Sequence, residues 1–295
     1  MIAMNKIAVN MPISRACSLL GIPRRSYYAR KPVQIRINSS QVSSHTVQRI
    51  RDIYHERVTY GYRRVWALLR NEGIRLNQKT VLKIMSEEGL SLEPHVHRNR
   101  KGWKSLFHPG GPDDLWETVT YIPTTSEGMT YLFNIKECFT KEWMGYFYSS
   151  TCNRKAALKS IENSVMMHPD RYPDAMVDGI NLRSDNGDQY TSSSFREHVK
   201  AMDFIQEFIE KSTPEQNGDI ESFHMSLKTD YIWVREIKNF SDGERIIESA
   251  FNDYNNIRPH SSIEYLAPKV FRERYLNDAR FRSMYDEKLE NRRNK

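Results

Sequence analysis

The spacing of hydrophobic residues changes once along the chain, near residue 114. Between residues 44 and 91, apolar side chains recur every three or four positions, as at Val47, Ile50 and Ile53, and this period predicts helices. Beyond residue 114, β-branched and aromatic residues alternate with polar ones over short runs, which predicts strands. The front of the chain is therefore predicted to be all-α and the remainder to be an α/β domain.

The second part is predicted to begin with three antiparallel strands, followed by helix, strand, helix, strand and a last helix that carries Glu221. The expected strands are 115–122, 130–139, 143–149, 176–184 and 204–209, and the expected helices before Glu221 are 153–167 and 193–202. Elements in this order are typical of the ribonuclease-H-like fold, in which helices flank a mixed five-stranded sheet.

Composition divides the chain further. Residues 1–105 contain 20 Lys or Arg against 6 Asp or Glu, whereas the rest of the chain has an excess of acids. A basic front part indicates nucleic-acid binding, with a solvated basic surface as the alternative. We expect a partial helix-turn-helix region at 1–38, a helical DNA-binding module at 44–92, a basic linker at 93–113, an α/β core at 114–275 and a charged tail at 276–295.

Residues 11–31 fit a helix-turn-helix arrangement. Gly21 is suited to end a first helix, and Pro23 is suited to the first turn of a second helix that carries Arg24 and Arg25. These two arginines are candidate DNA contacts, although an ordinary basic helical hairpin would have the same pattern. Because a single unit lies so close to the N-terminus, an upstream DNA-binding part could belong to a partner polypeptide.

The segment 44–92 is predicted to be a second DNA-binding unit, with a plain helical spacer as the alternative. Asn77 is suited to cap its last helix and Gly89 to end it. Its basic side chains fall outside the apolar face, where contact with phosphates would provide affinity and salt dependence without selecting a DNA sequence. The candidate contacts are Arg63, Arg64, Lys79 and Lys83.

Several classes of protein are disfavoured by the sequence. Cys17, Cys138 and Cys152 have no CxxC spacing, so a zinc site and a disulfide framework are both unexpected. No apolar run is long enough to span a bilayer, and the N-terminus lacks the apolar core of a signal peptide. We therefore expect a cytoplasmic protein, associated with the nucleoid when bound to DNA, with no membrane partner.

Two carboxylates in the second part have the local contexts of metal ligands. Asp185 follows a predicted strand and precedes Asn-Gly, which lets the backbone turn away and leaves the carboxylate facing open space. Glu221 lies on a helix seven residues before Lys228, a spacing that places both on one face. A carboxylate for metal beside a lysine for phosphate suits a surface along which DNA lies. Either acid alone would be an ordinary surface charge, but the two contexts together indicate a site.

Five motifs extend over nearly the whole chain. They are Ala16-Cys17-x-Leu-Leu-Gly-Ile-x-Arg24-x-x-Tyr27-Tyr, Tyr60-Gly-Tyr-Arg-Arg, Ser184-Asp185-x-Gly187-x-x-Tyr190, Asn217-x-x-x-Glu221-Ser-Phe-x-x-x-Leu-Lys228 and Tyr254-Asn-x-x-Arg258-Pro-His-x-Ser-Ile-x-Tyr-x-x-Pro268. With these motifs the chain resembles the integrase-core transposases of bacterial and archaeal insertion sequences, which carry a DDE triad and are related to retroviral integrases.

The resemblance implies that the core at 114–275 is an integrase-like catalytic core. It also implies binding of double-stranded DNA, namely the terminal inverted repeats of an insertion element and a target, and metal-dependent strand cleavage and transfer. Asp185 and Glu221 match the second and third acids and would be metal ligands, whereas Asn217 and Lys228 would contact DNA. The implied cofactor is Mg²⁺ or Mn²⁺, with two ions about 4 Å apart. Synapsis of two DNA ends implies a homo-oligomer.

The first acid of the triad departs from the family pattern. In the family it lies in a Trp-x-x-Asp-x-Thr-Tyr context, whereas this chain reads Leu115-Trp-Glu-Thr-Val-Thr-Tyr121, one residue short. Counting forward from Trp116 puts Val119 at the Asp position, and counting back from the Thr-Tyr pair puts Thr118 there. The nearest acid is Glu117, a candidate substitute that would face the other side of the sheet unless the strand slips or bulges.

Two functions follow from these observations. The first is a transposase with impaired activity, because losing one ligand should cost several kcal/mol of transition-state stabilisation. The alternative is a catalytically inactive DNA-binding relative that occupies element ends or joins transposase oligomers.

Overall fold

The computed structural model describes residues 42–90, 92, 109–121, 123–171, 179–210 and 218–293. The chain divides into two compact units, Met1–Arg49 and Ile50–Lys295, and the sheet and its helices lie in the second. The helix-turn-helix region predicted at 1–38 lies outside the described residues, as does most of the linker predicted at 93–113.

Three helices form the helical module. They are α4 (Ser44–Glu56), α5 (Tyr62–Asn71) and α6 (Gln78–Glu87). Their apolar side chains at helical spacing are buried, as predicted, including Ile53, Leu69 and Ile84. The side chain of Asn77 caps α6 by accepting a hydrogen bond from the backbone N–H of Lys79 at 2.9 Å. Past its end Gly89 has a φ of 70°, the left-handed conformation that glycine adopts readily.

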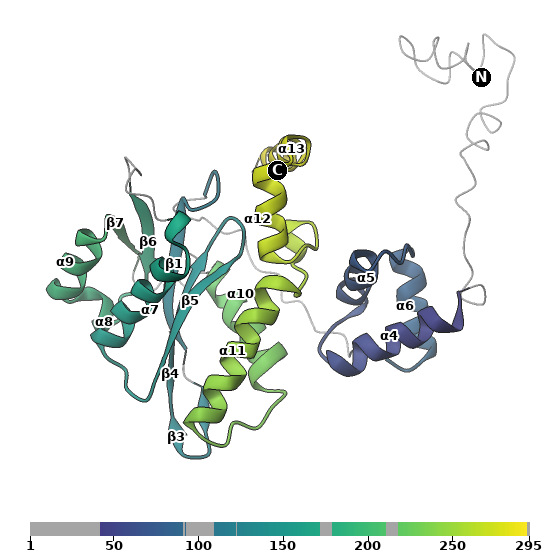
Figure 1. The fold of residues 1–295 in the computed structure, drawn as a ribbon, viewed down its shortest axis with the longest axis horizontal. Helices are drawn as coiled ribbons and strands as arrows, with labels where there is room; N and C mark the ends of the chain where they lie inside the picture. The colour runs from purple at the N-terminus through teal and green to yellow at the C-terminus, as the bar shows by residue number, and fades with distance from the viewer. Residues whose placement is uncertain are drawn as a thin grey trace, which may run out of the picture. The chain divides into compact units, whose positions relative to one another are not determined.

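The second part is organised around a mixed sheet (Figure 1). Its strands are β1 (Leu115–Tyr121), β4 (Tyr131–Glu137), β5 (Trp143–Ser149), β6 (Ile180–Ser184) and β7 (Phe204–Phe208). They lie in the order β5-β4-β1-β6-β7, with β4 antiparallel to β1 and β5, and β6 parallel to β1 and β7. The predicted five-stranded mixed sheet is confirmed.

Helices cover both faces of this sheet (Figure 1). They are α7 (Arg154–Met167) and α9 (Ser193–Ala201) on one face, and α10 (Gly218–Leu227) and α11 (Phe240–Asn256) on the other. Trp116 and Phe133 belong to the core under α7 and α9, whereas Leu132 and Trp143 belong to the core under α10 and α11. The neighbours Leu132 and Phe133 thus point to opposite faces, as the pleat of a strand requires.

Smaller elements complete the fold. They are the short strands β2 (Thr124–Thr125) and β3 (Gly128–Met129), 3-10 turns at Pro169–Arg171 and Ser261–Ile263, α8 (Asp188–Thr191), a π-helix at Lys228–Ile232, α12 (Pro268–Asn277) and α13 (Ala279–Arg293). Within the segment expected as a charged tail, Phe281 and Tyr285 pack with Phe139 and Phe271 in an aromatic cluster. In the part of the chain that the structure describes, no helix is long and apolar enough to cross a membrane.

Asn255 connects α11 to the edge strand β5. Its buried side chain accepts from the backbone N–H of Trp143 at 2.9 Å and donates to the carbonyl of the same residue at 2.8 Å. The Asn255→Ala substitution leaves two buried backbone groups without partners, and we expect a loss of about 2–4 kcal/mol in the free energy of unfolding. Urea denaturation measures it, with Asn256→Ala at the neighbouring exposed position as the control. If Asn255→Ala lowered the free energy of unfolding no more than Asn256→Ala does, this role would be contradicted.

Candidate active site and nucleic-acid interface

Asp185 lies immediately after β6, where the chain turns away from the sheet. Its carboxylate accepts a hydrogen bond from the backbone N–H of Gly187 at 2.9 Å, and the side chain is only partly buried. The amide of Asn186 donates to the carbonyl of Ile209 at 2.8 Å, which connects this turn to the end of β7. The Asp-Asn-Gly sequence thus forms the exposed strand-end turn that it predicted.

Glu221 lies on α10 and is exposed. The helix rests on the sheet through Ile220, Phe223 and Leu227, which are all buried. Two lysines hold its first turn through Asp219. The ammonium of Lys136 donates to the Asp219 carbonyl at 2.9 Å, and that of Lys141 to the Asp219 carboxylate at 2.8 Å. The position of Glu221 is therefore fixed by packing below it and by charge at the helix start.

The flank of α10 that carries Glu221 faces the end of β1. The ammonium of Lys228 lies 5.0 Å from the ring centre of Tyr121, and the ring centre of His224 lies 5.7 Å from it. Residues three and seven positions beyond Glu221 share its side of the helix. Because Tyr121 ends β1, these contacts bring His224 and Lys228 to the strand that carries the first acid in the family motif.

The pairing of β1 with β6 identifies the position beside Asp185. Leu115 pairs with Asn181 and Thr118 with Ser184, so the next step of the parallel register brings position 119 beside Asp185. Val119 also pairs with Asn134 in an uninterrupted register between β1 and β4. Of the two alignments considered, the one counted from Trp116 therefore matches the geometry.

Thr118 and Glu117 have other partners. The hydroxyl of Thr118 donates to that of Tyr190 at 3.4 Å, on the face covered by α7 and α9. The carboxylate of Glu117 is 2% exposed and forms an ion pair with Arg183, whose Nη1 lies 3.3 Å away. Arg183 also lies 3.0 Å from the carboxylate of Glu207. Two residues before position 119, Glu117 lies on the same face of β1 as that position, so the expectation that it would face the other side of the sheet was wrong. What removes it as a substitute acid is the buried ion pair with Arg183.

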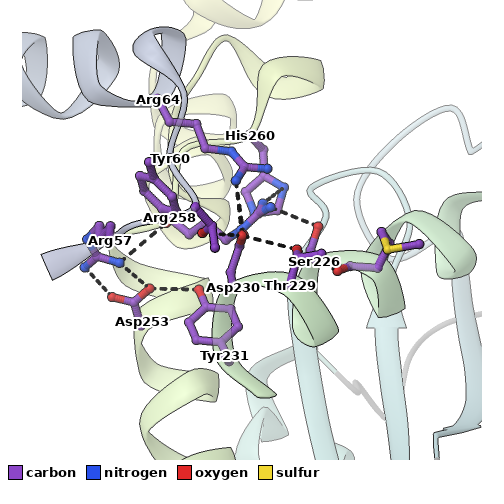
Figure 2. Close-up of polar contacts among 12 residues, drawn as sticks. Arg57, Tyr60, Arg64, Ser226, Thr229, Asp230, Tyr231, Asp253, Arg258 and His260 are labelled. Atoms are coloured by element: carbon purple, nitrogen blue, oxygen red, sulfur yellow. Dashed lines mark hydrogen bonds and ion pairs between the residues drawn. The ribbon is translucent and has the colours of Figure 1, made fainter. Parts of the chain in front are cut away.

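The predicted DNA contacts of the helical module differ in their surroundings. Arg63, Lys79 and Lys83 are exposed. Lys83 forms an ion pair of 3.6 Å with Glu87, and the guanidinium of Arg63 lies 5.3 Å from the ring centre of Tyr62. Arg64, by contrast, forms an ion pair of 3.1 Å with the buried Asp230, as Figure 2 shows. Arg24, Arg25 and Asn217 lie outside the described residues.

The carboxylates present do not make up a complete set of metal ligands. In the described ranges, no group of three or more His, Cys, Asp or Glu side chains is arranged to hold a metal ion. Asp185 and Glu221 are the two acids in the expected contexts, and the position beside Asp185 carries a valine. A three-carboxylate centre does not fit these residues.

Sequence reasoning did not predict the roles of Tyr121 and Asp230. Tyr121 supports Lys228 and His224, and its only sequence signal was its place at the end of the first core strand. Asp230 lies two residues beyond a recognised motif, and its partner Arg258 lies in another. No local pattern indicated that these two would pair.

Two family models match parts of this chain. An HTH-like domain matches residues 44–98, and an integrase core domain matches residues 203–268. The first range contains the helical module, and the second contains β7, α10 with Glu221, and α11.

Curated relatives match most of the chain. It is 27% identical over 269 residues to an uncharacterized 31.7 kDa protein of insertion element IS407 from Burkholderia multivorans, covering 89% of this chain and 91% of that protein. It is 29% identical over 244 residues to the transposase for insertion sequence element IS904 from Lactococcus lactis, covering 77% and 93%. It is 26% identical over 250 residues to transposase InsD for insertion element IS2 from Escherichia coli, covering 78% and 79%.

Solved structures with partial similarity come from retroviruses. A chain of the simian T-cell lymphotropic virus intasome is 13% identical with a TM-score of 0.48, covering 76% of this chain and 74% of that one. The HTLV-2 integrase catalytic core domain, solved in complex with magnesium, is 10% identical with a TM-score of 0.43, covering 57% and 99%.

The chain is thus a protein with an HTH-like domain ahead of an integrase core domain. It is a relative of insertion-element transposases, as its motifs predicted.

His224 provides a test of the packing around Glu221. Its Nε2 is buried without a hydrogen-bond partner among the described residues, and burial, with the nearby Lys228 and Lys136, lowers the pKa of the imidazole to about 3. The folded chain therefore keeps this ring neutral, whereas the unfolded chain protonates it near the ordinary pKa of 6.5. The stability that depends on the neutral ring is present above that pH and is lost as pH falls.

Wild-type stability should decline by up to about 1.4 kcal/mol for each pH unit below the ordinary value because of this group, and His224→Gln should remove that part of the decline. Urea unfolding at about pH 7 and about pH 5 measures the difference, with His55→Gln at an exposed position as the control. Parallel declines for wild type and His224→Gln would contradict the prediction.

Proposed function

We propose that the chain is a DNA transposase that binds the ends of an insertion element and carries out strand cleavage and strand transfer, with activity reduced by the missing first acid. The proposal rests mainly on one observation. Asp185 directly follows β6, and Glu221 shares a side of α10 with His224, which contacts Tyr121 at the end of the neighbouring β1, as does Lys228 just beyond the helix. Such a protein would act in the cytoplasm, on the nucleoid.

The carboxylates would be ligands for divalent metal, Mg²⁺ or Mn²⁺, with two ions in a complete site of this kind. When bound, such ions activate the attacking oxygen and stabilise the leaving one. Here the donor set is short of one carboxylate, because position 119 beside Asp185 is a valine. The ammonium of Lys228, held over Tyr121, would contact a DNA phosphate next to the two acids.

The DNA would be double-stranded, with the terminal inverted repeats of an element and its target as the two substrates. The exposed Arg63, Lys79 and Lys83 of the helical module would contact phosphates. Pairing two element ends would require more than one copy of the chain, so we also propose a homo-oligomer.

One observation favours a second candidate function, a DNA-binding relative without catalysis. Val119 cannot ligate metal as a carboxylate does, and Glu117, the acid nearest to it in β1, is held by Arg183. A protein that keeps the scaffold and loses turnover would still occupy element ends or join oligomers of active transposases.

Adding a carboxylate at position 119 tests these alternatives. Val119→Asp should raise strand cleavage of an element-end duplex in Mg²⁺ or Mn²⁺ on the order of 100-fold over wild type, because it supplies the ligand beside Asp185. Val119→Asn, which has the same shape without the charge, should give no increase. Cleavage is followed on denaturing gels with end-labelled DNA.

Glu221→Gln in the Val119→Asp background should abolish the gained activity while leaving DNA binding intact. If Val119→Asp cuts no better than Val119→Asn, the non-catalytic DNA-binding function is supported instead. Normal cleavage by the unmodified chain would show that the valine does no damage.

The phosphate contacts predict a salt dependence. Lys79→Met should weaken binding to duplexes of any sequence and lower the slope of log affinity against log salt concentration by about 1, because one counterion-releasing contact is lost. Lys159→Met, at an exposed position of α7, is the matched control. An unchanged slope for Lys79→Met in fluorescence-anisotropy titrations would remove Lys79 from the DNA interface.

A further inference from the structure

Asp230 lies in the π-helix that continues α10 without a break. The side chain is 3% exposed and accepts hydrogen bonds from its neighbour Thr229 and from three residues far away in the sequence. The Arg258 Nε lies 2.8 Å away, the Arg64 Nη1 3.1 Å and the Thr59 hydroxyl 2.8 Å (Figure 2). One buried carboxylate thus joins the integrase core to two residues of the HTH-like domain.

Arg258 connects this carboxylate to the helix of Glu221. Its guanidinium is also buried, and it donates to the hydroxyl of Ser226 in the last turn of α10 at 2.9 Å. The ring of His260 lies 3.2 Å from the same guanidinium, and burial followed by the charge of Arg258 lowers the pKa of that imidazole well below its ordinary value. A neutral His260 therefore adds no repulsion.

A second ion pair lies beside the first. The guanidinium of Arg57 contacts the carboxylate of Asp253 at 2.5 and 2.8 Å, and the hydroxyl of Tyr231 donates to the same carboxylate at 2.8 Å (Figure 2). Between the two pairs lies the ring of Tyr60, which is 1% exposed. The guanidinium of Arg57 lies 5.3 Å from its centre and that of Arg64 lies 5.1 Å from it. The aromatic ring and two carboxylates therefore separate three guanidinium groups.

The contact between the HTH-like domain and the core depends on the negative charge of Asp230, because Arg64 and Arg258 are both positive. Burial alone would raise the pKa of Asp230, but Arg258 and Arg64 lower it below its ordinary value, so the carboxylate is ionised. Without that negative charge, Arg64 would face the buried Arg258 with no anion between them. Removing one partner of a buried charge network is strongly destabilising because the remaining charge loses its counter-ion. Arg64, at 31% exposure, is the arginine that can leave for solvent.

We propose that Asp230 is a positioning residue that fixes the HTH-like domain to the end of the Glu221 helix, so that DNA bound by the domain lies at a set distance from Asp185 and Glu221. The placing of DNA relative to Asp185 and Glu221 rests on the proposed function, whereas the contact between the domains does not. It also separates two adjacent arginines: Arg63 faces solvent as a DNA contact, and Arg64 faces the core as a docking residue.

The distance between the two domains tests this proposal in the full chain. Spin labels are placed on the exposed Cys152 of the core and on Ser86→Cys at an exposed position of α6, in a Cys17→Ser background. Double electron–electron resonance should give one narrow distance for wild type. Asp230→Asn and Arg64→Met should each broaden it toward longer distances, and Arg63→Met, with the same loss of charge one residue away, should leave it unchanged.

A distribution that stays narrow in Arg64→Met and in folded Asp230→Asn would overturn the proposal. If Asp230→Asn fails to fold, Arg64→Met decides, because that side chain is partly exposed on the domain surface. Binding of a mixed-sequence duplex is measured on the same variants without labels. It should weaken in Arg63→Met and be retained in Arg64→Met. Absence of binding by wild type would count against the proposed function, while the distances would still decide the role of Asp230.

Discussion

The parallel pairing of β1 with β6 is the constraint on which the whole acidic site depends. Trp116 and Leu182, adjacent partners in this pairing, are both fully buried in the same core. A slip of one residue would turn every side chain of β1 to the opposite face and take Trp116 out of the core under α7 and α9. The register of β1 is therefore fixed from Trp116 to position 119. The residue that β1 lacks relative to the family motif must be missing beyond position 119. Position 119 therefore lies beside Asp185, and Tyr121, at the end of β1, lies against Lys228.

The helix that carries Glu221 is held at both ends although the carboxylate set is incomplete. Lys136 and Lys141 fix its first turn through Asp219, and Arg258 fixes its last turn through Ser226. The contacts of Lys136 and Arg258 are partly buried, so they resist solvent screening better than surface pairs do. The chain thus keeps the scaffold that fixes the helix of Glu221, on which the proposed function rests.

The order of strands and the two carboxylate contexts could be predicted from sequence because both are local. Hydrophobic alternation defined the core strands, and Asp-Asn-Gly defined the turn at Asp185. The π-helix after α10 was not predicted, since no Gly or Pro marks the change at Lys228. Because residues 276–295 are highly charged, the burial of Phe281 and Tyr285 was not predicted. Their partner Phe139 lies far away in the sequence.

Ion pairs between residues far apart in the sequence could not be predicted from local patterns either. Arg64 and Asp230 are 166 residues apart, and Arg63 and Arg64 were indistinguishable until α5 had a buried and an exposed side. Glu117 was a reasonable substitute acid until its partner Arg183, on the neighbouring strand, was known. Such pairings depend on which strands are adjacent, and that is a property of the whole fold.

Counting the Mn²⁺ ions that the unmodified full chain binds, by electron paramagnetic resonance with Asp185→Asn as the reference, tests most directly whether the site lacks a third carboxylate. Two carboxylates without a third beside Asp185 predict weak binding and no tightly held second ion. Two tightly bound ions, both lost in Asp185→Asn, would contradict it, because they would require another ligand in place of the carboxylate that position 119 lacks.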